Sequence, residues 1–166
     1  MRTLKVSASP IHGLGVFAAR AIAQGEEILT VDDRRVVDAR SPLRPELSEY
    51  DYYLDYLAKG KKVLLQNPER HLNHGCESNT CLRTRAGERR LVALRDIAAG
   101  EEFTLDYSLN RKLDKSLACR CGSQRCRGTI FLDYFKLPAE LQKDRLPLLE
   151  AWFIEEHGLG GGTAAG

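Results

Sequence analysis

The chain lacks any long apolar segment. None of its apolar runs reaches the roughly 18 residues of a membrane-spanning helix, and its N-terminus mixes polar and apolar side chains. The sequence therefore gives no sign of a membrane span or a signal peptide. We expect a protein of the cytoplasm or another reducing compartment inside the cell, with no membrane partner.

An excess of charge of one sign is also absent. The 166 residues contain 25 Lys and Arg against 23 Asp and Glu, and the basic residues are scattered rather than gathered into a stripe. This balance disfavours nucleic-acid binding, so we expect no direct nucleic-acid partner. The length suits one domain, which we expect to be monomeric and to bury enough surface to fold without a metal.

Cysteine is scarce, but its spacing is informative. Cys119, Cys121 and Cys126 fall within eight residues. A tetrahedral zinc ion takes four ligands, so these thiols need a fourth partner. Cys76 is the best candidate, although His74 and Cys81 also lie within reach of such a site. Free thiols without an export signal also indicate a reducing compartment.

The fifth cysteine, Cys81, has a simpler interpretation. A cysteine outside a reactive or metal-binding pattern behaves as a small apolar side chain. We expect Cys81 to be buried in the core.

Two segments of the chain repeat one another at an offset of 75 residues. Residues 18–28 match residues 93–103, and each reads as a strand, a turn and a second strand. Gly25 and Gly100 occupy the turns, where a positive φ favours glycine. The repeat predicts a mainly β fold.

Residues 45–57 carry apolar side chains at helical spacing, which predicts a short helix. The segment is also acidic and rich in tyrosine. A packed amphipathic helix accounts for this pattern. The sharper interpretation is an acidic, aromatic wall that receives a cationic peptide, and both can hold because a helix has two faces.

The C-terminal part predicts a helical extension. Pro138 is suited to begin a helix, and Pro147 should interrupt or kink it before His157. Residues 158–166 are rich in Gly and Ala, and we expect a flexible tail.

Four motifs occur in a fixed order: Gly-Leu-Gly at 13–15, an Arg-to-Cys segment at 70–76, Gly-Glu-Glu-Phe-Thr-Leu-Asp-Tyr at 100–107, and the cysteine trio. In this order and spacing, over about residues 4–130, they resemble the SET-domain protein-lysine methyltransferases. Three positions depart from the family pattern. Gly75 replaces a usual Ser, Ser78 replaces a common Pro, and Leu105 replaces a Tyr near the lysine channel, which bears on the number of methyl groups added.

The resemblance implies a SET-domain fold of small β-sheets with knot-like threading and short helices. We expect the SET domain over residues 1–115, with a variable insert at about 31–65. A zinc-bound post-SET segment follows over 116–132, then the helical extension over 133–157 and the tail. No cysteine-rich segment precedes the domain, so we expect a minimal SET plus post-SET protein.

The resemblance also implies methyl transfer from S-adenosylmethionine to the ε-amine of a lysine in a histone-like or other lysine-rich protein. Tyr107 would be the catalytic residue, and the post-SET site would hold one Zn²⁺. The implied zinc ligands are Cys76, Cys119, Cys121 and Cys126. The implied cofactor-binding residues are Gly13, Leu14, Gly15, Arg70, Asn73, His74 and Tyr107.

Three further residues have expected neighbours. Phe131 or Tyr134 would complete the lysine channel. Glu102 would pair with an arginine such as Arg70 or Arg95 as a structural contact.

Two other functions also fit parts of the pattern. A SET-like module could bind its ligands without turnover, although it would then have no need of both the Asn73-His74 pair and Tyr107. A thiol redox or metal-buffering protein would use the Cys-x-Cys pair and would show reactive thiols without a chelator.

Overall fold

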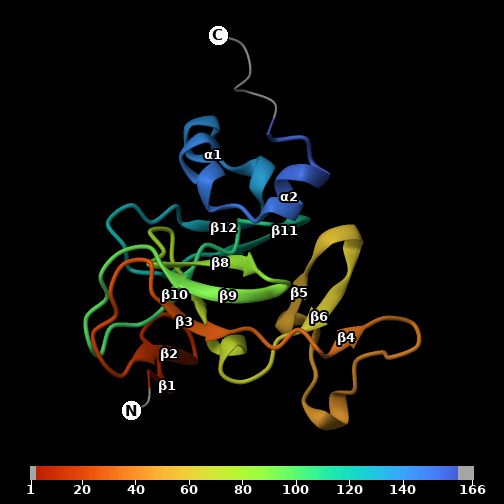
Figure 1. Ribbon diagram of the computed structural model, residues 1–166, viewed down its shortest axis with the longest axis horizontal. Coiled ribbons are helices and arrows are strands. Elements are labelled where there is room, and N and C mark those ends of the chain that lie inside the picture. Colours follow the sequence, from red (N-terminus) through yellow and green to blue (C-terminus); the bar gives the residue numbers. More distant parts are fainter. Residues whose placement is uncertain (1–2, 161–166) are drawn as a thin grey trace.

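Short strands account for most of the regular structure in residues 3–160, the part of the chain that the computed structural model describes (Figure 1). The strands are β1 (Leu4–Ala8), β2 (Leu14–Ala18), β3 (Glu27–Thr30), β4 (Val36–Val37), β5 (Leu54–Tyr56), β6 (Lys62–Leu64), β7 (Asn73–His74), β8 (Thr80–Arg85), β9 (Glu88–Ala93), β10 (Thr104–Leu105), β11 (Lys112–Ala118) and β12 (Thr129–Asp133). The helices are α1 (Ala139–Arg145) and α2 (Ala151–Glu156), with short 3₁₀ turns η1 (Pro45–Leu47), η2 (Asp51–Tyr53), η3 (Ala58–Gly60), η4 (Glu69–His71), η5 (Tyr134–Lys136) and η6 (Leu146–Leu148).

The strands form several small sheets rather than one large one. β3, β9 and β8 form one antiparallel sheet, and β4, β6 and β5 form another. β1 pairs with β2, and β11 pairs with β12, again antiparallel. β7 and β10 pair in parallel. The mainly β architecture with small sheets is confirmed.

The two repeated segments pair with each other. Gly25 and Gly100 have φ values of +80° and +86°, as the turns require. Ile22 and Ile97 exchange backbone hydrogen bonds of 2.9 Å in both directions. Each copy therefore supplies the partner of the other copy instead of closing its own hairpin.

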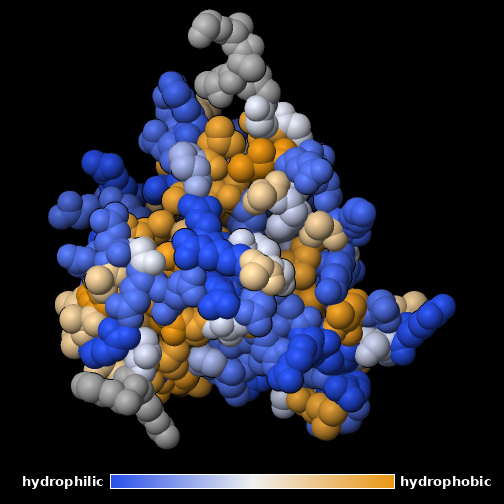
Figure 2. Space-filling view, in the orientation of Figure 1, coloured by the Kyte–Doolittle hydropathy of each residue, from blue (hydrophilic) through white to orange (hydrophobic). Residues whose placement is uncertain are grey.

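The apolar side chains form two clusters. The first packs β2, β3 and β9 around fully buried Val16, Leu91 and Phe103. The second lies beneath the C-terminal helices and contains Tyr134 and Phe153. Figure 2 shows a mostly hydrophilic face, with apolar side chains visible over the C-terminal helices at the top.

The predicted helix over residues 45–57 is wrong. The chain forms η1 and η2 and then enters β5, which pairs with β6. Ion pairs inside the protein favour this conformation over a helix. Glu49 is buried and bonded by Arg35 and Arg44, and Asp55 is buried and bonded by Arg89 and Arg111. Two of the four carboxylates of the segment are thus engaged inside the protein, while Glu46 and Asp51 stay exposed.

Two prolines mark where the helices of the C-terminal extension begin and end. α1 begins directly after Pro138, and Pro147 lies in η6, which separates α1 from α2. The predicted tail covers residues 158–166. Residues 158–160 form a turn in which Leu159 donates its N–H to the carbonyl of Ile154 at 3.0 Å and packs against the C-terminal cluster, and residues 161–166 lie outside the described residues. Within residues 3–160, no helix is long and apolar enough to cross a membrane.

Candidate active site and metal centre

The parallel pairing of β7 and β10 brings the middle of the chain to Tyr107. Thr104 lies opposite Asn73, and Leu105 lies opposite His74. The backbone N–H of Tyr107 donates to His74 Nδ1 at 3.1 Å. The two rings meet edge to face, with centroids 5.4 Å apart. Two motifs about 30 residues apart in sequence therefore form one structural unit.

The side chain of Asn73 joins this unit to the Gly13–Gly15 loop. Its amide nitrogen Nδ2 donates to the carbonyls of His12 and Leu14 at 3.1 and 3.0 Å. It also donates to Glu102 Oε1 at 2.8 Å. The amide hydrogens of Asn73 are thus engaged within the protein.

Within residues 3–160, Glu102 forms no ion pair with an arginine, contrary to the expectation from the sequence. Arg95 pairs with the neighbouring Glu101 instead. Glu102 accepts bonds from the Ser9 hydroxyl at 2.8 and 2.9 Å and from Asn73. Its carboxylate therefore ties the N-terminal loop to β7.

Gly15 is required by this carboxylate. A Cβ at Gly15 would lie 2.2 Å from Glu102 Oε1, far inside van der Waals contact. The loop at Gly13 differs, because it has a φ of +49° and a Cβ there would meet nothing within 4 Å. There is no room for a side chain at Gly15, whereas there is room for one at Gly13.

Tyr107 is held at both its backbone and its hydroxyl. The hydroxyl donates to the carbonyl of Leu72 at 2.5 Å. Burial raises the pKa of Tyr107 to about 12, so the phenol stays protonated at neutral pH. The guanidinium carbon of Arg111 lies 5.4 Å from the ring centroid, within the range of a cation–π contact.

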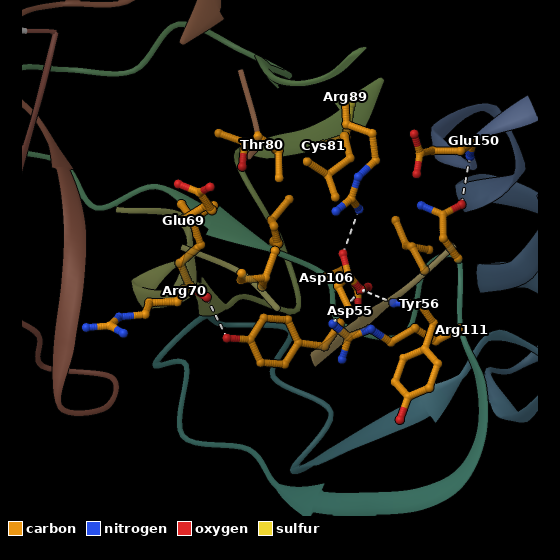
Figure 3. A pocket seen from close by; sticks show the side chains of 18 of the residues that line it. Asp55, Tyr56, Glu69, Arg70, Thr80, Cys81, Arg89, Asp106, Arg111 and Glu150 are labelled. Carbon is orange, nitrogen blue, oxygen red and sulfur yellow. Dashed lines mark hydrogen bonds and ion pairs between the residues drawn. The ribbon is translucent and has the colours of Figure 1, made fainter. Parts of the chain in front are cut away.

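A pocket of about 90 Å³ opens beside Tyr107 (Figure 3). Its lining includes Leu72, Leu105, Tyr52 and Tyr56. Arg70 also lines it, with its guanidinium carbon 5.2 Å from the ring of Tyr53.

Neither Phe131 nor Tyr134 lines this pocket. Tyr134 is buried in the C-terminal cluster, and its hydroxyl donates to the carbonyl of Gln142 at 2.6 Å. It packs there because η5 turns its ring toward Phe153. The expectation that Tyr134 completes a channel is therefore wrong for this pocket, and Phe131 packs against the same cluster.

The far wall of the pocket is an ion network. Asp55 accepts from Arg89 at 2.6 Å and from Arg111 at 3.0 Å, and Figure 3 shows both guanidinium groups directed at it. Arg89 also bonds Asp33 at 2.6 Å. Because Arg111 also covers Tyr107, strand β5 is connected to the candidate catalytic residue.

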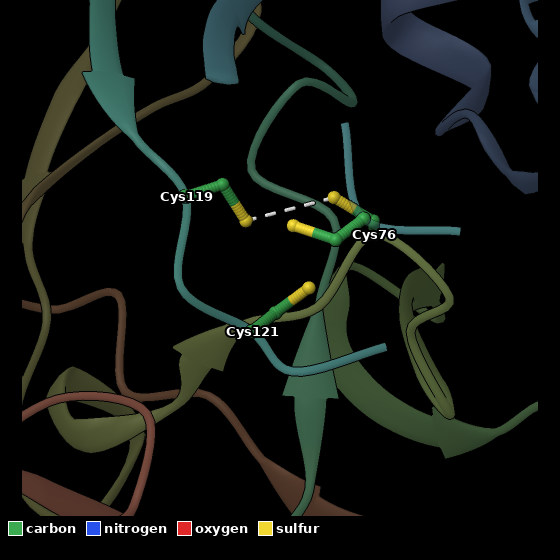
Figure 4. A group of neighbouring side chains, drawn as sticks. Cys76, Cys119 and Cys121 are labelled. Atoms are coloured by element: carbon green, nitrogen blue, oxygen red, sulfur yellow. Dashed lines mark hydrogen bonds between the residues drawn. The ribbon is translucent and has the colours of Figure 1, made fainter. Parts of the chain in front are cut away.

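The four predicted cysteines come together. The sulfur atoms of Cys76, Cys119, Cys121 and Cys126 all lie within 4.8 Å of one another, and Figure 4 labels three of them. Cys76 and Cys119 are 3.6 Å apart at sulfur. A zinc ion with bonds of about 2.3 Å would set tetrahedral sulfur atoms about 3.8 Å apart. The donor set and its spacing therefore fit a zinc ion.

Cys81 and His74, the two other candidate metal ligands, are not part of the four-cysteine cluster. Cys81 is 3% exposed on β8, outside the cluster, as expected for a small core residue. His74 Nε2 lies 3.3 Å from Cys76 Sγ. Since His74 Nδ1 accepts from Tyr107, its hydrogen lies on Nε2 and faces the Cys76 sulfur. Burial lowers the pKa of His74 to about 4, so the ring is neutral.

Comparison with known proteins decides the family. A family model described as the SET domain matches residues 13–108. The chain belongs to the SET-domain family. The cysteine trio follows the matched SET segment, consistent with a post-SET element that is completed by Cys76 from within the domain.

Similar proteins agree with this assignment. The SET chain is 32% identical over 133 residues to the "Histone-lysine N-methyltransferase, H3 lysine-4 specific" of Saccharomyces cerevisiae, covering 72% of this chain and 12% of that protein. It is 31% identical over 130 residues to human "Histone-lysine N-methyltransferase 2B", covering 72% of this chain and 5% of that protein. It thus spans only a small part of these relatives.

A solved structure supports the fold. The crystal structure of KRYPTONITE in complex with mCHG DNA and SAH matches with a TM-score of 0.57 at 22% identity, over 77% of this chain and 29% of that one. At this identity the match bears on the SET fold alone.

Sequence reasoning missed some of the residues that build the SET site. The sequence predicts a different partner for Glu102 and indicates no role for Arg111 or Arg127. Glu102 belongs to the motif at 100–107, but its partners Ser9 and Asn73 are distant in the sequence, and Arg111 and Arg127 are single charged residues without a periodic pattern. Arg127 had one usable signal, which is its position directly after Cys126.

Proposed function

We propose that this SET domain transfers a methyl group from S-adenosylmethionine to the ε-amine of a lysine in a protein substrate. The main support is the convergence of three distant segments. The Gly13–Gly15 loop, the Asn73-His74 strand and Tyr107 are joined by the hydrogen bonds of Asn73 and His74. A structural β-strand would not need this set of contacts at one place.

The loop and β7 suit a donor molecule. S-adenosylmethionine, when bound, supplies a methyl group activated by a sulfonium charge. Gly13 has open space where a Cβ would lie, and Leu14 is 47% exposed. His12, Gly13 and Leu14 are exposed, so this end of the loop is open to a ligand, whereas Gly15 is buried. We assign donor binding to Gly13, Leu14 and Gly15, together with Arg70, Asn73, His74 and Tyr107.

The chemistry asks mainly for alignment and for a neutral amine. A lysine with a pKa near 10.4 needs about 4.6 kcal/mol to present its neutral amine at pH 7. Tyr107 does not act as a base, because its phenol is protonated and already donates to Leu72. Its oxygen can accept a hydrogen bond from the amine and orient it. Desolvation in the pocket lowers the lysine pKa.

The four cysteines would hold one Zn²⁺ with thiolate ligands. The metal would fix residues 119–126 against Cys76, next to the Asn73-His74 strand. Its role is structural, because all four positions are filled by protein. Thiolate ligands of this kind require a reducing compartment.

The substrate we propose is a histone-like or other lysine-rich tail. The names of the similar proteins support histone lysine as the acceptor. The tyrosines of η2 support a site for an extended peptide, since Tyr52 is 67% exposed and lines the pocket. Leu105 lines the same pocket without a hydroxyl, so we propose space there for more than one added methyl group.

A filter assay with labelled donor on a protein mixture tests the proposal. We expect label in protein with the zinc-loaded chain. A SET-like module that only binds would transfer none. A thiol redox protein would show reactive thiols before chelation, whereas the proposed zinc site exposes them only after it.

A further inference from the structure

Arg127 connects the cysteine cluster to the segment that carries Tyr107. It follows Cys126 directly, and its backbone N–H lies 3.3 Å from Cys76 Sγ. Its guanidinium donates to both oxygens of Asp106, at 2.8 and 2.7 Å. One residue thus contacts a candidate metal ligand with its backbone and the residue before Tyr107 with its side chain.

The Arg127–Asp106 pair is almost fully enclosed. The Asp106 side chain is 0% exposed, and that of Arg127 is 12% exposed. The two parallel N–H···O bonds form the bidentate arrangement that most strictly fixes orientation. A buried pair of this type is costly to break, because the remaining charge is left without a partner.

Asp106 in turn orders its surroundings. Its Oδ1 accepts from the backbone N–H of Ser108 at 3.1 Å and lies 3.7 Å from His74 Nδ1. The guanidinium of Arg127 also reaches the Ser108 hydroxyl at 3.2 Å. The turn on both sides of Tyr107 is therefore held from the cysteine segment.

We propose that Arg127 is a positioning residue that couples metal loading at the four cysteines to the order of the Tyr107 segment. The metal fixes Cys126, the adjacent Arg127 then holds Asp106, and Asp106 holds the turn that places the Tyr107 hydroxyl. The proposal rests on the metal site of the proposed function but not on its reaction. It predicts that removing the metal and removing the Arg127 side chain have the same local effect.

Amide hydrogen exchange over residues 104–110 tests this coupling without any donor or substrate. We compare the zinc-loaded wild type, the chelated wild type and Arg127→Gln. Arg125→Gln is the matched control, because the Arg125 side chain is 87% exposed on the same loop. In zinc-loaded Arg127→Gln we expect exchange to speed up about tenfold with full zinc content. Chelation should bring the wild type to the same rate and add little in the variant.

Wild-type exchange in zinc-loaded Arg127→Gln would overturn the coupling. Equal acceleration by chelation in both proteins would overturn it as well. If Arg127→Gln does not fold, Arg127→Lys decides, since Lys keeps the charge without the bidentate bonds. Intermediate exchange in that variant supports the proposal, and wild-type exchange overturns it.

Binding of S-adenosylhomocysteine by calorimetry is the second readout. We expect Arg127→Gln to bind about tenfold more weakly than Arg125→Gln, a loss of about 1.4 kcal/mol. A wild type that binds none would contradict the proposed function, while the exchange result would still decide the coupling.

Discussion

At the scale of single residues, Tyr107 holds a fixed position without being a base. Its hydroxyl donates to Leu72, its N–H donates to His74, and Arg111 covers its ring. Because the raised pKa keeps the phenol neutral, its contribution is one of orientation.

Tyr107→Phe should therefore lose methyl transfer while it keeps donor binding. We expect a reduction of kcat by about 100-fold or more, as for loss of a positioning group at a reacting centre. Affinity for S-adenosylhomocysteine should stay within about threefold, because a hydroxyl already bonded to Leu72 offers little to the donor. Labelled transfer and calorimetry measure the two effects. Unchanged turnover in the variant would show that Tyr107 is not the catalytic residue.

Gly15→Ala should destabilise the fold through Glu102. The added Cβ lies 2.2 Å from Oε1, so the carboxylate must move away from Ser9 and Asn73. We expect a cost of about 1–3 kcal/mol in the free energy of unfolding, measured in urea. In the Glu102→Ala background the same substitution should cost much less. Equal costs in both backgrounds would show that the carboxylate is not the cause.

At the scale of elements, the turns were predictable and the structure of residues 45–57 was not. Gly25, Gly100 and Pro138 act through their own backbone, so local sequence predicts their places. Residues 45–57 have helical spacing but form turns and a strand. The deciding contacts of Asp55 come from Arg89 and Arg111, which are distant in sequence. Local periodicity contains no information about such partners.

Asp55→Asn should weaken the insert and change its response to acid. Burial alone would raise the pKa of Asp55, but Arg111 and Arg89 lower it below its usual value. The unfolded chain therefore binds this proton more readily, so the stabilisation is present above the usual pKa and is lost as the pH falls. We expect a loss of about 3 kcal/mol at neutral pH, from unpaired arginine charge.

Unfolding followed from pH 7 towards pH 2 measures this effect. The decline with acid should be shallower in Asp55→Asn than in the wild type. Glu46→Gln, at an exposed position of η1, is the control and should follow the wild type. A parallel decline in all three proteins would argue against a depressed pKa at Asp55.

At the scale of the whole molecule, two apolar clusters support the fold, and the metal that we propose would order one region. Neither cluster includes any of the four cysteines. The candidate site depends instead on segments that meet only after folding. The resemblance to a family indicated which motifs matter, whereas the links through Glu102, Arg111 and Arg127 required the structure.

Cys121→Ser should lose the metal but not the fold. We expect metal content to fall well below one zinc per chain and transfer to be lost, because three thiols hold zinc poorly. Circular dichroism should still show a cooperative unfolding transition. Global unfolding of this variant would mean that the apolar clusters are not sufficient without the metal.

Mass spectrometry of a panel of lysine-rich proteins and histone tails, after incubation with S-adenosylmethionine, tests the central claim most directly. The account predicts mass increases of methyl groups on lysine with the wild type, and none with Tyr107→Phe. A zinc-loaded, folded wild type that binds S-adenosylhomocysteine but methylates no lysine in the panel would contradict it.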